Sequence, residues 1–83
     1  MFEIAIPRSV EKQIKKLSDK IHGRVLHEIE GLARNPRPLN CKKLVGEDLF
    51  RIRVGDYRVI YAIDDSRRRV VIARVGHRRD VYR

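Results

Sequence analysis

Apolar and polar side chains alternate along much of the segment LFRIRVGDYRVIYAI, residues 49–63. A period of two residues is typical of a β-strand that buries one face. The alternation breaks at Gly55-Asp56, where glycine tolerates the positive φ of a two-residue hairpin turn. The pattern therefore predicts two antiparallel strands joined by this turn.

The turn determines which residues of the predicted hairpin face one another. The opposing pairs are Val54 with Tyr57, Arg53 with Arg58, Ile52 with Val59, and Arg51 with Ile60. One face is then apolar and continuous, formed by Phe50, Ile52, Val54, Tyr57, Val59, Tyr61 and Ile63. The other face gathers Arg51, Arg53 and Arg58. Like charges opposite each other in a sheet cost up to about 1 kcal/mol. This face therefore indicates a site for an external anion, although a solvated face that keeps the sheet soluble would show the same pattern.

The rest of the chain predicts two more strands and two helices. Met1–Ile6 alternates weakly and ends at Pro7, as an edge strand does. Ser9 is expected to cap a first helix, whose apolar stripe is Val10, Ile14, Leu17 and Ile21. A second helix follows, with the stripe Ile21, Val25, Ile29 and Leu32, and ends at Asn35-Pro36-Arg37-Pro38. Residues 69–75 form a further strand, and Gly76 is expected to mark a bulge or bend.

This order of strand, helix, helix and three strands predicts one α+β domain over residues 1–83. The sheet is expected to be small and mainly antiparallel, with both helices packed on one face. The helices would cover the apolar face of the hairpin and leave the arginines open. An 83-residue chain is near the lower limit for a self-sufficient core.

The net charge of +9 is concentrated in the second part of the chain. Residues 51–83 hold ten arginines, no lysine and four aspartates. Because arginine pairs with phosphate through a planar fork, this part favours nucleic acid or an acidic protein as a partner. The single cysteine excludes an intrachain disulfide, and the three histidines lack metal-ligand spacing, so no metal or cofactor is expected. No signal peptide or long apolar run is present, which predicts a cytoplasmic protein without a membrane partner.

Three segments together resemble the RelE family of bacterial and archaeal toxins, within the wider RelE/ParE superfamily. They are KLVG (residues 43–46), LFRIRVGDYRVIY (residues 49–61) and VGHRRDVYR (residues 75–83). The resemblance implies a RelE-like, microbial-ribonuclease-like fold and a toxin of a type II toxin–antitoxin system. It also implies a ribosome-dependent endonuclease that cuts mRNA in the ribosomal A site. Its partners would be the ribosome, A-site mRNA and a small acidic antitoxin similar to RelB.

The resemblance also implies which residues form the catalytic site. These are Arg51 and Arg53, which replace lysines of well-studied members, together with Arg58, Arg78 and Tyr82. Further cations are expected to contact RNA, namely Lys42, Lys43, Arg79 and Arg83, although ordinary loop lysines would equally account for Lys42 and Lys43. Arginine stabilises a charged phosphate well but stays protonated, so it is a poor proton acceptor. Either Tyr82 or His77 is therefore expected to move the proton, if neither has a purely structural role.

Other functions remain open at the level of the sequence. A ParE-like toxin that inhibits DNA gyrase would share the fold and the strand YRVIY (residues 57–61) but would not need convergent arginines. A nucleic-acid-binding module would bind RNA in a salt-sensitive way without cutting it. The arginine face would also suit a protein that only docks an acidic antitoxin. Arginine density together with VGHRRDVYR favours the nuclease.

Overall fold

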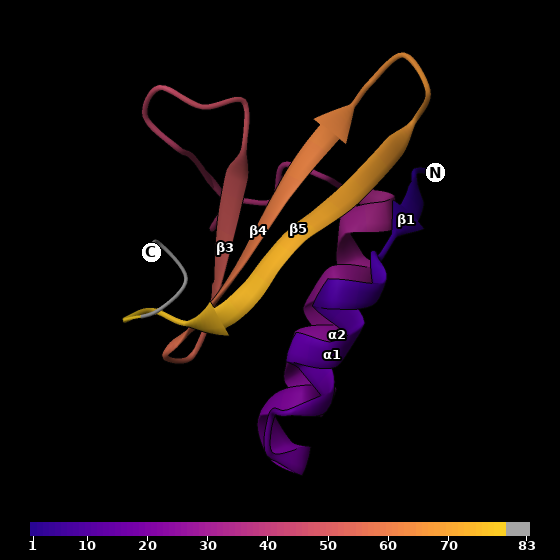
Figure 1. Cartoon of the computed structure of the whole chain (residues 1–83). Coiled ribbons are helices and arrows are strands. Elements are labelled where there is room, and N and C mark those ends of the chain that lie inside the picture. Colours follow the sequence, from indigo (N-terminus) through magenta and orange to yellow (C-terminus); the bar gives the residue numbers. More distant parts are fainter. Residues whose placement is uncertain (80–83) are drawn as a thin grey trace.

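The chain folds into the predicted order of elements, with one short strand added (Figure 1). The computed structural model describes residues 1–79. The elements are β1 (Glu3–Ala5), α1 (Arg8–Lys15), α2 (Asp19–Arg34), β2 (Lys42–Lys43), β3 (Phe50–Val54), β4 (Tyr57–Asp64) and β5 (Arg69–His77). The sequence does not predict β2, because alternation cannot be recognised over two residues.

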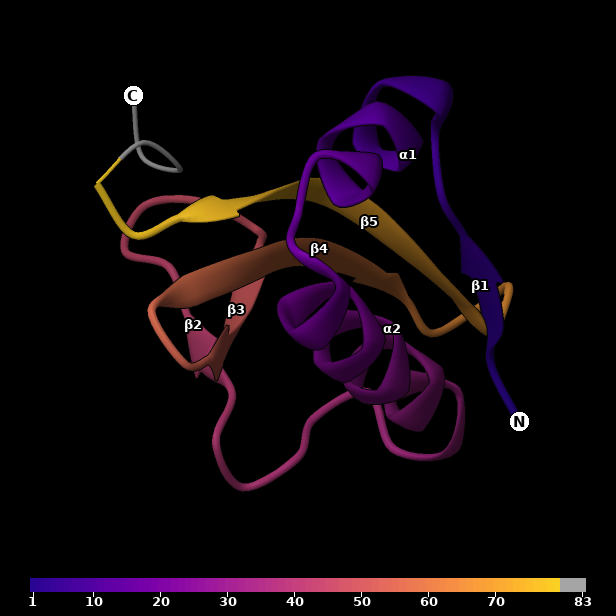
Figure 2. The ribbon, with the colours of Figure 1, turned by 90° about the horizontal axis from the view of Figure 1, so that it is seen from below.

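The strands form one sheet in the order β1-β5-β4-β3-β2. β1 runs parallel to β5, and the other neighbouring pairs are antiparallel. Both helices pack on the same face of the sheet, α1 against β5 and α2 against β1 and β3 (Figure 2). The predicted α+β fold, with a mainly antiparallel sheet and two helices on one face, is confirmed.

The hairpin between β3 and β4 has the predicted turn. Gly55 has a φ of 62°, a conformation that favours glycine. The paired residues are those expected, namely Val54 with Tyr57, Arg53 with Arg58, Ile52 with Val59, and Arg51 with Ile60. A shift by one residue would turn the apolar side chains away from the helices, so burial of that face stabilises this register.

The two helices bury most of the predicted stripes, but the first begins earlier than expected and ends at Lys15, so Leu17 lies between the helices and is only partly buried. Their buried residues are Val10 and Ile14 on α1, and Val25, Ile29 and Leu32 on α2. The N-cap of α1 is Pro7, whose carbonyl oxygen accepts hydrogen bonds from the backbone N–H groups of Val10 and Glu11. The prediction that Ser9 caps this helix is therefore wrong. Within residues 1–79, neither helix is long and apolar enough to cross a membrane.

Tyr61 on β4 is a large, fully buried side chain that ties the loop after α2 to the sheet. Its hydroxyl donates a hydrogen bond of 2.8 Å to the carbonyl oxygen of Pro36. Its ring stacks on Phe50, with the centroids 6.0 Å apart. The guanidinium of Arg37 lies over the Phe50 ring and donates hydrogen bonds of 3.2 and 2.9 Å to the Asp65 carboxylate. These contacts hold the loop between α2 and β2 against the sheet.

A bulge in β5 reverses the alternation of its side chains. The pairs on either side of the bulge are Ile60 with Arg74 and Tyr61 with Ile72. Ala73 is thus left without a partner on β4. The bulge or bend predicted at Gly76 is wrong, because Gly76 pairs directly with Arg58 and the strand continues to His77. The irregularity lies three residues earlier than the glycine suggests.

The buried hydroxyl of Tyr61 predicts a loss of stability at alkaline pH. Burial raises the pKa of Tyr61 above its ordinary value. An unfolded tyrosine ionises near pH 10, whereas the folded one keeps its proton, so stability falls as the pH rises above about 10. The substitution Tyr61→Phe should cost about 1–3 kcal/mol at neutral pH, because the Pro36 carbonyl loses its partner.

Thermal unfolding of both proteins between neutral pH and pH 11 tests this prediction. The difference in stability between wild type and Tyr61→Phe should shrink above pH 10, because only the wild type loses the contribution of the protonated hydroxyl. Ionisation of the lysines cancels in this difference. A constant difference across the range would contradict the assignment of the alkaline loss to Tyr61.

Candidate active site

Six cationic side chains of the strands lie on the sheet face that the helices leave uncovered, and five of them fall in two neighbouring rows, whereas Arg69 pairs with Asp64 farther along the sheet. Directly paired residues of neighbouring strands point to the same side of a sheet. One row crosses four strands and consists of Lys42, Arg51, Ile60 and Arg74. The next row consists of Arg53, Arg58 and Gly76. We call this surface the arginine face and define it by Lys42, Arg51, Arg53, Arg58 and Arg74.

Arg58 lies in the centre of the arginine face and is buried, with only 6% of its surface exposed. Its Nη1 donates a hydrogen bond of 3.2 Å to the carbonyl oxygen of Tyr57. The helices leave this face uncovered, as expected, but Arg58 is buried there all the same. Ile60 on the same side is also buried, with 4% of its surface exposed. The physical reason is that β4 has a neighbouring strand on each side, so its side chains lie between those of β3 and β5.

Within residues 1–79, the arginines of the hairpin have no acidic partner. Arg53 lies directly opposite Arg58 and is exposed, and Arg51 is half-buried. None of these three residues forms an ion pair with any residue in 1–79. A buried guanidinium that has only a carbonyl oxygen as a partner retains most of its attraction for an anion. This geometry suits a phosphate group.

His77 lies on the other side of the sheet from Arg58. It pairs with Tyr57 across β4 and β5, and the two rings meet edge to face with centroids 5.5 Å apart. Val75, two residues earlier on the same side, belongs to the core under the helices. The Nδ1 atom of His77 accepts a hydrogen bond of 3.3 Å from the backbone N–H of Arg79. The structure thus does not bring His77 to the arginine face.

The other predicted residues are divided between the two sides of the sheet or lie beyond it. Lys42 pairs with Arg51 and joins the arginine face, whereas Lys43 pairs with Phe50 on the apolar side and lies 3.9 Å from Asp48. Arg78 and Arg79 are exposed just after β5. The backbone N–H of Arg78 donates a hydrogen bond of 2.9 Å to the backbone carbonyl oxygen of Asp56, and this bond holds Arg78 at the hairpin turn. Tyr82 and Arg83 lie outside the described residues.

Arg74 is a member of the arginine face that the sequence does not predict. Strict alternation from Val70 and Ile72 would point it toward the helices. The unpaired Ala73 reverses this, so Arg74 shares a side with Ile60 and Arg51. The signal that the sequence offered is a charged residue, Arg74, in the middle of a mostly apolar strand. The sequence does not indicate on which face of the sheet that residue lies.

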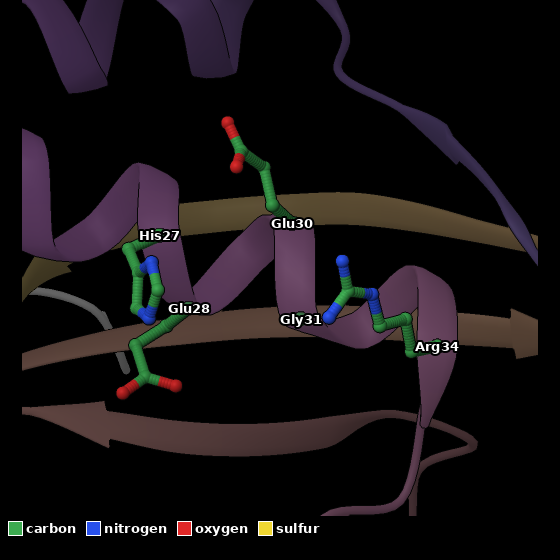
Figure 3. Close-up of a pocket in the computed structure, with 5 residues that line it drawn as sticks. All are labelled: His27, Glu28, Glu30, Gly31 and Arg34. Carbon is green, nitrogen blue, oxygen red and sulfur yellow. The ribbon is translucent and has the colours of Figure 1, made fainter.

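A pocket on the outer side of α2 lacks the features of a catalytic site (Figure 3). It is lined by His27, Glu28, Glu30, Gly31 and Arg34. Only this helix contributes to it, and Glu28 and Glu30 point to different sides of the helix (Figure 3). Within residues 1–79 no three histidine, cysteine or acidic side chains converge as metal ligands. The arginine face is therefore the stronger candidate.

Known toxins resemble this chain in sequence. A family described as "ParE toxin of type II toxin-antitoxin system, parDE" matches residues 4–82. Toxin RelE of Mycobacterium tuberculosis is 36% identical over 85 residues, which cover 99% of this chain and 87% of the relative. Toxin RelG of the same organism is 36% identical over 87 residues, which cover 99% of this chain and 97% of the relative.

Solved structures of toxin–antitoxin complexes share the fold. The RelBE2 complex of M. tuberculosis matches with a TM-score of 0.82 and 32% identity, over 93% of this chain and 98% of that one. The archaeal RelE–RelB complex of Pyrococcus horikoshii matches with a TM-score of 0.84 and 29% identity, over 96% of this chain and 98% of that one. The similarity therefore extends over the whole arrangement of helices and strands.

Proposed function

Because this chain belongs to the RelE/ParE family of type II toxin–antitoxin toxins, we propose that it is a ribosome-dependent endoribonuclease. In this proposal it cuts mRNA in the ribosomal A site and so inhibits translation. The observation that carries the proposal is the burial of Arg58 in the centre of a cationic face. The Arg58 guanidinium forms no ion pair with a carboxylate within residues 1–79. Such a residue is well placed to stabilise charge that develops on a phosphate.

The proposed reaction is the attack of a ribose 2′-hydroxyl on the adjacent phosphorus. The 2′ oxygen forms a bond to phosphorus as its proton leaves, and the bond to the 5′ oxygen breaks as that oxygen takes up a proton. The products are a 2′,3′-cyclic phosphate and a 5′-hydroxyl. Arg58 would stabilise the phosphate oxygens in the transition state, while Arg51 and Arg53 hold the phosphate beside it.

Proton transfer needs a residue other than these arginines. Arginine stays protonated in proteins and cannot accept the proton of the 2′-hydroxyl. The position of His77 beside Tyr57 argues against it, because the sheet separates its ring from Arg58. We therefore propose that Tyr82 transfers the proton. Arg78, Arg79, Lys42 and Arg83 would supply further positive charge near the RNA.

The proposed partner in the neutralised state is a small acidic antitoxin similar to RelB. Two relatives of known structure, from M. tuberculosis and P. horikoshii, are toxin–antitoxin complexes. The net charge of +9 would attract an acidic chain, and Arg51, Arg53 and Arg58, which form no ion pair within residues 1–79, offer it partners. Cleavage on the ribosome would take place in the cytoplasm.

Mapping of 5′ ends by primer extension tests the proposed activity. Purified protein is added to ribosomes that carry a defined mRNA, with free mRNA and the Arg58→Ala variant as controls. A new 5′ end within the A-site codon, absent with Arg58→Ala, is the expected result. Intact mRNA at high protein concentration would contradict the nuclease.

Inhibition of DNA gyrase is the second candidate, because the matching family is described by the name ParE. A supercoiling assay with purified gyrase separates the two functions. The nuclease proposal expects unchanged supercoiling. Inhibition of supercoiling together with intact mRNA would contradict the nuclease proposal and indicate that the arginine face only binds a partner.

A further inference from the structure

The row through Lys42, Arg51, Ile60 and Arg74 extends beyond the proposed phosphate site in both directions. Lys42 lies on the edge strand β2, and Arg74 lies on β5, on the other side of the central strand β4. Neighbouring strands are about 4.8 Å apart, so the backbones at the two ends of the row are about 14 Å apart. Both end residues are exposed.

The bulge at Ala73 is what places Arg74 in this row. Ile72 before the bulge and Val75 after it both belong to the core under the helices. In a regular strand these two residues would point to opposite sides. The extra residue lets both point inward while Arg74 points to the arginine face. A bulge that re-aims a side chain in this way is typical of a functional surface.

Ile60 separates the cations of this row into two groups. It is a buried apolar residue between Arg51 and Arg74, and it is not part of the core under the helices. Each phosphodiester carries a single negative charge, so five cations exceed what one phosphate can neutralise. The two ends of the row, Lys42 and Arg74, lie where phosphates on either side of the reactive one would pass.

We propose that Arg74 and Lys42 bind the RNA backbone on opposite sides of the reactive phosphate, so that the RNA strand crosses the sheet from β2 to β5. This inference rests on the proposed function, since it takes RNA as the ligand of the arginine face. Neither residue takes part in bond making. Both are positioning residues that set the direction of the bound strand.

The salt dependence of binding measures the number of phosphate contacts. For single strands the slope of log K against log salt concentration changes by about 0.7 for each phosphate neutralised. The probe is a short, uniformly 2′-O-methylated RNA, which cannot be cut, and affinity is followed by fluorescence anisotropy at several KCl concentrations. Arg74→Gln and Lys42→Gln should each make the slope about 0.7 shallower, whereas Arg74→Lys should retain it.

Two controls make the result specific. Arg67→Gln removes the same charge from the exposed turn between β4 and β5 and should leave the slope unchanged. Binding of a dinucleotide with a single phosphate should be the same for Arg74→Gln and wild type, because a neighbouring phosphate is then missing. Thermal unfolding of each variant establishes that it is folded.

Two results would overturn the proposed path. One is an unchanged slope for both Arg74→Gln and Lys42→Gln. The other is equal loss of affinity for the dinucleotide and the longer RNA in Arg74→Gln, which would place Arg74 at the reactive phosphate. Ribosomal cleavage is measured separately, so it can persist when the path fails. A shallower slope without any cleavage would support the proposed path of the RNA and contradict the proposed nuclease activity.

Discussion

Replacing Arg58 by methionine is expected to abolish most of the cleavage while making the protein more stable. Loss of one preorganised donor to the developing charge typically lowers a rate by about 10²–10³-fold. Methionine keeps much of the side-chain volume but removes a buried charge that faces Arg53 directly. Removing this repulsion and the cost of desolvating the guanidinium should raise the free energy of unfolding by about 1 kcal/mol. For a domain of this size, that corresponds to a melting temperature about 4–8 °C higher.

The two effects are measured on the same preparation, by primer extension on ribosomes and by thermal unfolding. Arg67→Met is the matched control, because Arg67 is exposed in a turn and its Nε lies 3.9 Å from Asp64. It should change neither property appreciably. A lower melting temperature for Arg58→Met would show that Arg58 stabilises the fold. Undiminished cleavage would remove Arg58 from the catalytic site.

The substitution Tyr82→Phe should lower the rate of cleavage by about 10²–10⁴-fold, the usual contribution of a general acid or base. His77→Ala should leave the rate within a few-fold, because the histidine ring lies beside Tyr57 on the other side of the sheet. Single-turnover cleavage on mRNA-loaded ribosomes, measured over a range of pH, compares the two variants. The cleavage rate of the Tyr82→Phe variant should also lose the part of its pH dependence that the tyrosine hydroxyl produces.

Tyr57→Phe provides the control for removal of a tyrosine hydroxyl elsewhere on the sheet. It keeps the ring that meets His77, so it should preserve both cleavage and stability. A large loss in His77→Ala with an unchanged melting temperature would reverse the assignment and make the histidine the proton carrier. Full activity in both Tyr82→Phe and His77→Ala would exclude proton transfer by either residue.

The arginine face carries a cost in stability. Arg53 and Arg58 face each other in the sheet, and no acidic residue in 1–79 pairs with either of them. A protein selected for stability alone would place a carboxylate or a neutral residue at one of these positions. An anion from outside, either a phosphate of RNA or a carboxylate of an antitoxin, would relieve the repulsion. Binding at this surface is therefore favoured by the fold itself.

Local patterns in the sequence determined the hairpin and every helix and strand except the two-residue β2. The period of two residues around Gly55-Asp56 yields the observed pairing of Arg53 with Arg58, because turn length and the burial of one face together specify a register. The helix stripes that include Val10 and Ile29 are also correct, since a period near four residues needs no information from distant parts of the chain.

Only the tertiary structure decided which cations share a face and how deeply they lie. The bulge at Ala73 depends on how β5 pairs with β4, and it turns Arg74 toward the arginines and His77 away from them. The burial of Arg58 depends on strands that flank β4 on both sides. These properties arise from how separate strands pair within the sheet, which a local pattern of residues does not encode.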